Sequence, residues 1–104
     1  MNDDRLNQLQ AMLQKSPDDT FLLYGLAMEH KKREQGQTAL EYLQKVIQLD
    51  PQYCYAYFQQ GQIYENLGET DAARQAYQQG IDAAGRKGDA HAQQEMQGAL
   101  SMLE

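Results

Sequence analysis

Apolar residues recur at helical spacing along almost the whole chain, and short polar or turn-forming stretches separate the periodic segments. Near the start, Leu6, Leu9 and Leu13 stand three and four residues apart, which places their side chains on one helix face. Only two prolines occur and no run of β-branched residues, so propensity favours helix over strand. The pattern predicts six helices, at about residues 4–15, 19–33, 38–49, 53–67, 70–84 and 89–103.

Residues that cap or break helices lie between these segments. Asp18 or Asp19 is expected to cap the second helix, Thr70 the fifth and Asp89 the sixth, because their side-chain oxygens can accept from free backbone amides. Gly68 is expected to end the fourth helix, and the stretch from 85 to 88, which begins and ends with glycine, is expected to break the fifth.

A shift of 34 residues superimposes the middle of the chain on itself. Small residues fall on small ones, as Ala27 on Gly61 and Ala39 on Ala73. Large apolar residues fall on large ones, and Pro17 falls on Pro51. The large pairs are Leu23 with Tyr57, Tyr24 with Phe58, Leu43 with Tyr77 and Ile47 with Ile81. Small residues let paired helices approach closely and large ones fill the space beside them, so the chain contains an internal repeat.

The period and the residue pattern resemble the tetratricopeptide repeat family, whose motif sets large, small and aromatic residues at fixed places on two helices. The first repeat fills these places with Leu23, Leu26-Ala27, His30, Ala39, Leu43 and Pro51. The second fills them with Tyr57, Gln60-Gly61, Tyr64, Ala73 and Tyr77. Gln60 replaces a leucine, Gly85 replaces a proline and Glu34 takes a turn-glycine place, so the match is imperfect. It is strong over about residues 18–87.

The resemblance implies an all-α fold, a right-handed stack of antiparallel helix pairs of the α-solenoid type. One domain is expected over 1–104. It would consist of a half-repeat at 4–17, repeats at 20–53 and 54–87, and a capping helix at 89–103.

Charge and composition exclude several classes of partner. The formal net charge of −6 argues against nucleic acid, which requires a basic patch. No apolar run approaches the roughly 20 residues that span a bilayer, and the acidic opening does not resemble a secretion leader, so we expect a cytoplasmic protein without a membrane partner. The one basic cluster, Lys31 to Arg33, is interpreted as a solvated helix end, with contact to an acidic partner as the alternative.

Residues that could carry chemistry are few and scattered. Two serines, two histidines and the single Cys54 share no spacing typical of a nucleophile with its base. His30 occupies the family's tyrosine place, so we expect it to be packed and hydrogen-bonded. The histidines have no ligand spacing with each other or with a carboxylate. We therefore expect no enzyme activity, no metal and no cofactor.

The resemblance also implies a binding surface, because in the family the first helices of successive repeats line a groove that holds a partner peptide. Transferred by position, the peptide-binding groove consists of Phe21, Tyr24, Met28, Tyr55, Phe58, Gln59, Gln62 and Glu65. Spacings of three, four and seven keep each set on one helix face. The alternative is that these side chains are covered by the N-terminal half-repeat or by a second copy of the chain.

Some family members grip a terminal carboxylate with cations on this groove. Here the matching places hold Tyr24, Met28 and Gln59, and no cation is expected at the groove centre, so we expect no such clamp. The predicted function is a non-enzymatic interaction or scaffold module for a neutral or basic protein or peptide. The alternative is a homodimer formed through the same apolar surfaces.

Overall fold

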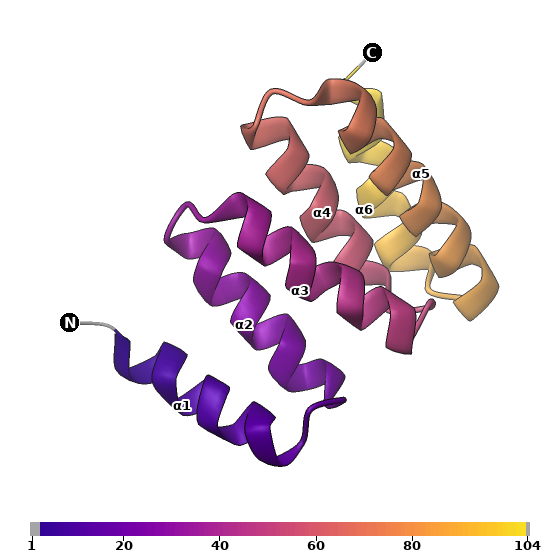
Figure 1. The fold of residues 1–104 in the computed structure, drawn as a ribbon. Coiled ribbons are helices and arrows are strands. Elements are labelled where there is room, and N and C mark those ends of the chain that lie inside the picture. Colours follow the sequence, from indigo (N-terminus) through magenta and orange to yellow (C-terminus); the bar gives the residue numbers. More distant parts are fainter. Residues whose placement is uncertain (1–2, 104) are drawn as a thin grey trace.

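The computed structural model describes residues 3–103; Met1 and Asn2, at the start of the acidic opening, and Glu104 lie outside this range. The described chain consists of helices joined by short turns, without a strand, which confirms the predicted all-α fold (Figure 1). The helices are α1 (Asp3–Lys15), α2 (Thr20–Lys32), α3 (Gly36–Leu49), α4 (Cys54–Asn66), α5 (Thr70–Lys87) and α6 (Ala90–Ser101).

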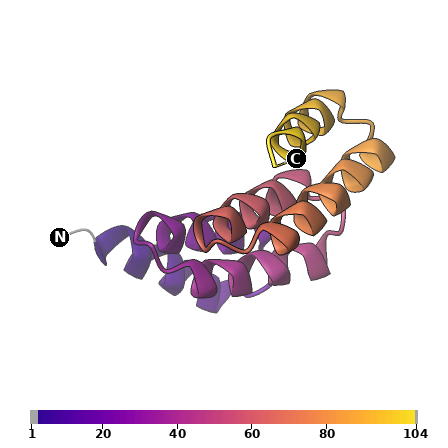
Figure 2. The ribbon, with the colours of Figure 1, turned by 90° about the horizontal axis from the view of Figure 1, so that it is seen from above.

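Helices that follow one another in sequence pack side by side. The tightest neighbours are α4 with α5 and α2 with α3, followed by α5 with α6, while α1 packs mainly against α2. Figure 1 shows these neighbours running antiparallel. Seen from above, the row is bent, and α6 at its far end lies on the side of α4 that faces away from α3 (Figure 2). α6 also contacts α4 directly.

The core is divided along the row into three apolar clusters, each between neighbouring helices. The first holds α1 on α2 through Leu9, Leu22 and Leu26. The second, mainly between α2 and α3, contains Leu23, Ala27, Ala39, Leu40, Leu43, Val46, Ala56 and Ile63. The third, between α4, α5 and α6, contains Cys54, Tyr57, Ala73, Tyr77, Ile81, Ala83, Ala84, Ala92 and Met96. The small residues that the repeat predicted at helix crossings are therefore buried.

Helices α4 and α5 approach each other closely at Gly61 on α4. A Cβ atom added there would lie 2.6 Å from Cδ1 of Tyr77, well inside van der Waals distance. The Tyr77 ring is fully buried, and its hydroxyl donates a hydrogen bond to the Glu65 carboxylate. Glycine is needed at this position because the ring occupies the space of a side chain.

Several helix ends differ from the predictions. Asp19 and Asp89 do cap α2 and α6, but Thr70 does not cap α5, whose N-cap is Glu69 without a side-chain bond. The predicted break at Gly85 is wrong, because α5 continues to Lys87 and ends at Gly88 in the left-handed conformation. A glycine inside a helix costs only about 1 kcal/mol, which packing against α6 can offset.

The turn after α2 also differs from the prediction. Helix α3 begins at Gly36, two residues earlier than expected. Glu34 has a φ of 59° and so adopts the left-handed conformation at the place where the family usually has glycine. Glutamate is rarely found there, and the helices on either side hold it in place.

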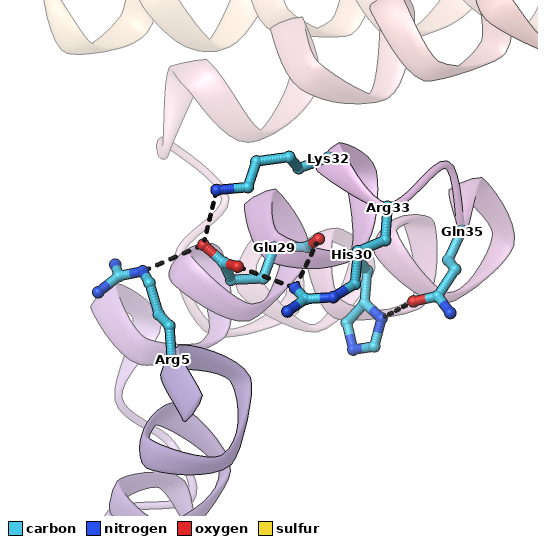
Figure 3. Close-up of polar contacts among 6 residues, drawn as sticks. All are labelled: Arg5, Glu29, His30, Lys32, Arg33 and Gln35. Carbon is cyan, nitrogen blue, oxygen red and sulfur yellow. Dashed lines mark hydrogen bonds and ion pairs between the residues drawn. The ribbon is translucent and has the colours of Figure 1, made fainter. Parts of the chain in front are cut away.

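A buried carboxylate ties α1 to the C-terminal end of α2. The Glu29 side chain is 9% exposed and accepts from Arg33 at 2.8 Å and from Arg5 at 3.1 Å, with Lys32 at 3.9 Å (Figure 3). The Arg33 hydrogen bond is the main cause that lowers the pKa of Glu29, with Lys32 and Arg5 adding to it. The basic cluster is therefore only partly a solvated helix end, because Arg33 is engaged with Glu29.

His30 is packed and hydrogen-bonded, as predicted. Its Nδ1 lies 2.7 Å from the Gln35 side-chain oxygen (Figure 3), and its ring stacks on Tyr42 with 5.5 Å between centroids. Within residues 3–103, no helix is both long enough and apolar enough to cross a bilayer.

Candidate protein-binding face

The eight predicted groove residues occupy one side of α2 and α4, which we call the α2–α4 face. Two cross-helix contacts show that the two stripes adjoin. The Gln59 side chain on α4 lies close enough to the Tyr24 hydroxyl on α2 to lower its pKa, against the larger effect of burial, which raises it. Lys31 on α2 donates hydrogen bonds to Gln59 and Gln62. The structure thus brings Tyr24, Gln59 and Gln62 together, whereas Phe21 extends the α2 stripe toward solvent with 75% of its surface exposed.

One end of the face is aromatic. The rings of Tyr24 and Tyr53 lie 5.2 Å apart between centroids, and the Tyr55 hydroxyl donates to Glu95 of α6 at 2.6 Å. This hydrogen bond is the main cause that raises the pKa of Tyr55 to about 12. A pocket of about 350 Å³ opens here, lined by Tyr24, Tyr53, Cys54, Tyr55, Lys87 and Asp89.

The other end is polar and carries a cation. Lys31 Nζ donates to the side-chain oxygens of Gln59 at 2.5 Å and Gln62 at 2.7 Å. Burial lowers the pKa of this lysine. The sequence predicted no cation at the centre of the groove, and Lys31 places one at its polar end. The sequence argument assigned Lys31 to a solvated helix end, but its flexible four-carbon stem lets the ammonium reach across to α4.

The remaining predicted residues differ in how open they are. Phe58 is half-buried, with its ring centroid 6.2 Å from that of Tyr55 and 6.0 Å from that of Tyr77, so it also belongs to the third core cluster. Met28 is half-buried against the second cluster. Glu65 is exposed and accepts the Tyr77 hydroxyl. Phe58 and Met28 therefore pack against the core and contribute only part of their side chains to the α2–α4 face.

The alternative that the N-terminal half-repeat covers the groove side chains does not hold for Phe21. Helix α1 packs on Leu22 and Leu26, which lie on a neighbouring side of α2, and it leaves Phe21 largely exposed. The helix that approaches the face is α6, through Glu95. Sequence reasoning did not find α6, Tyr53 or Lys31 as parts of the site. Tyr53 and α6 lie outside the stripes that the repeat register predicts. Lys31 stands seven residues after Tyr24 and three after Met28, so its spacing could have placed it on the α2 stripe, but it was assigned to a solvated helix end.

Within residues 3–103, the side chains most able to act in catalysis, Cys54 and His91, are bonded to different partners and not to each other. Cys54 is buried and its thiol donates to the Gln52 carbonyl, and burial is the main cause that raises its pKa, which disfavours the reactive thiolate. His91 is exposed on α6, and its Nε2 lies 3.4 Å from the Glu95 carboxylate. Over residues 3–103, no three His, Cys, Asp or Glu side chains gather as a metal site.

Comparisons with known proteins agree with this architecture. Two sequence profiles of the tetratricopeptide repeat family match, one over residues 22–53 and the other over 42–75. The TPR repeat-containing protein PA0015 of Pseudomonas aeruginosa is 32% identical over 96 residues, which are 92% of this chain and 91% of that protein.

Solved structures show the same helical stack. A tetratricopeptide repeat domain protein of Salinibacter ruber is 36% identical, with a TM-score of 0.79 over 85% of this chain and 89% of that one. Protein BPP2914 of Bordetella parapertussis is 32% identical, with a TM-score of 0.82 over 93% of this chain and 84% of that one. Proteins of this repeat type are in general protein-interaction modules without enzyme activity. The profiles cover residues 22–75 and the relative covers nearly the full length, so the chain belongs to the tetratricopeptide repeat family.

Proposed function

We propose that this protein is a non-enzymatic scaffold that holds an extended segment of a partner protein on the α2–α4 face. The observation that carries the proposal is the exposure of Phe21, 75%, beside half-buried Tyr24 on the same helix stripe. Aromatic residues, Phe and Tyr among them, are enriched at protein interfaces relative to the rest of the surface.

The polar groups beside these rings suit a peptide backbone. The side-chain amides of Gln59 and Gln62 line the face and are held in place by Lys31. An amide group both donates and accepts, so it can bond the peptide groups of a partner whatever side chains that partner carries. The aromatic residues would supply affinity and the glutamines would supply alignment.

Charge favours a neutral or basic segment. The protein carries a net charge of −6, and Glu65, Asp89 and Glu95 lie on or beside the face, against Lys31 and Lys87. Such complementarity acts mainly on the association rate and on the choice of partner. The competing function is self-association through the same face.

The test is to remove the exposed ring without touching the core. A partner is first recovered from native lysate and identified by mass spectrometry. Phe21→Ala should then weaken its binding, measured by calorimetry, by about 2 kcal/mol or more, which is roughly 30-fold in Kd. Leu49→Ala is the matched control, because Leu49 is an exposed apolar residue on α3, outside the face. Its Kd should stay at the wild-type value.

Two results would contradict the proposal. One is unchanged affinity in Phe21→Ala with the helical circular dichroism spectrum intact. The other is a concentration-independent dimer in light scattering that dissociates in Phe21→Ala, which would assign the face to self-association.

A further inference from the structure

We propose that the pocket at the aromatic end of the α2–α4 face binds an arginine side chain of the partner segment. This inference rests on the proposed function and adds the chemistry of one subsite. We call this site the tyrosine pocket, lined by Tyr24, Tyr53, Cys54, Tyr55, Lys87 and Asp89, with a volume of about 350 Å³.

The walls of the tyrosine pocket are aromatic and come from separate parts of the chain. Tyr24 belongs to α2, and Tyr53 and Tyr55 flank the start of α4. Lys87 is the last residue of α5, and Asp89 caps α6. The rings of Tyr24 and Tyr53 are inclined by 31°, with 5.2 Å between centroids. Ring faces attract cations, and a planar guanidinium stacks on them better than an ammonium does.

One carboxylate lines the pocket and two more lie beside its tyrosines. Asp89 is part of its wall, and Glu95 accepts the Tyr55 hydroxyl. Asp50 lies near Tyr53: after burial and Tyr24, its charge adds to the causes that raise the pKa of the Tyr53 hydroxyl. Lys87 is the opposing cation in the wall. Three carboxylates against one ammonium leave an excess of negative charge, which favours a cationic guest.

The pocket is continuous with the rest of the face. Tyr24 lines the pocket and its hydroxyl also lies beside Gln59, whose side-chain oxygen accepts from Lys31. A segment whose backbone lies against Gln59 would therefore pass the mouth of the tyrosine pocket. A basic side chain on that segment can enter the pocket while the segment remains on the α2–α4 face.

The test uses a blocked tripeptide, acetyl-Gly-Arg-Gly-amide, titrated into the full-length ¹⁵N-labelled protein. The backbone amides of Cys54, Tyr55 and Asp89 should shift and saturate. The same peptide with Gln in place of Arg should bind more weakly, and with Glu it should bind most weakly. Tyr53→Leu should raise the Kd of the Arg peptide roughly two- to thirtyfold, the range of a cation–aromatic contact.

Charge substitutions at the pocket should change the Kd in opposite directions, which a purely structural effect would not reproduce. Asp89→Asn should raise the Kd and Lys87→Gln should lower it, each by roughly two- to fivefold. Asn also caps helices well, so Asp89→Asn keeps the bond that Asp89 accepts from the Ala92 amide. Glu41→Gln, an exposed site on α3, changes the net charge equally and should leave the Kd unchanged.

A Glu peptide that binds more tightly than the Arg peptide would overturn the inference, because Lys87 and the start of α4 would then define an anion site. So would shifts that spread over the surface without saturating, or a Lys87→Gln variant that binds no tighter. The proposed function has a separate readout. Loss of the native partner in Phe21→Ala together with no Arg binding would keep the α2–α4 face and remove the tyrosine pocket from it.

Discussion

Alanine in place of Gly61 would test the helix crossing on which the repeat register depends. Inside a helix, glycine to alanine normally stabilises, because alanine has the higher helix propensity. At Gly61 the new Cβ would lie 2.6 Å from Cδ1 of the buried Tyr77 ring and nearer still to Cε1. The ring is rigid and fully enclosed, so it cannot rotate away and must shift with its helix.

The expected magnitude combines three contributions. Overpacking of a tight core typically costs about 1–3 kcal/mol. A shifted ring also weakens the hydrogen bond from the Tyr77 hydroxyl to the Glu65 carboxylate, and a bond to a charged group contributes about 1.5–3 kcal/mol. Helix propensity returns about 1 kcal/mol. We expect Gly61→Ala to lower the free energy of unfolding by about 2–4 kcal/mol.

The matched control is Gly98→Ala. Gly98 also lies within a helix, α6, but an added Cβ there meets no atom within 4 Å. This variant should gain about 0.5–1 kcal/mol. Urea unfolding followed by circular dichroism, analysed by linear extrapolation, measures both changes. Equal stability of the two variants, or a Gly61→Ala protein as stable as the wild type, would refute the assigned crossing.

Two further predictions concern the ends of the stack. Glu29→Gln should destabilise the protein at neutral pH, and the difference from wild type should close as the pH falls below about 4. The reason is that the folded pKa of Glu29 lies below its unfolded value, so its ion pairs stabilise the fold above the unfolded pKa and are lost as the carboxylate is protonated. A difference in urea midpoint between the variant and the wild type that is the same at neutral pH and below about pH 4 would contradict this. Deleting residues 89–104 should expose Tyr77 and Ile81 and remove buried Met96, so the protein should aggregate or melt without cooperativity. A monodisperse truncated protein with the wild-type melting temperature would show that α6 is a tail rather than a cap.

The sequence alone determined the helices, the repeat period and most of the buried face. Helical spacing is a local property, and a 34-residue shift aligns small residues such as Ala39 and Ala73, which the structure buries completely. A helix pair needs a small residue at its crossing wherever it lies in the stack. For this reason the identity of the core could be predicted without knowing how the pairs are arranged.

The sequence also predicted which helix faces would form the candidate site, but not what surrounds them. The stripes on α2 and α4 follow from residue spacing, and Tyr24 and Gln59 do meet. The tyrosine pocket, by contrast, is made by α2, the start of α4 and the connection to α6 together. No local pattern contains that combination.

Only the tertiary structure decided where the long polar side chains go and where some helices end. Lys31 and Arg33 are close in sequence, yet one crosses to Gln59 on α4 and the other pairs with Glu29 beside α1. Gly85 remains helical although glycine disfavours helix. Arg33 and Glu29 are four residues apart on one helix surface, so that pair is local, whereas Lys31 reaches Gln59 and Gln62 on α4 and Gly85 packs against Gln93 of α6. In the last two cases the local preference is worth about 1 kcal/mol or less, and the groups that outweigh it lie on another helix.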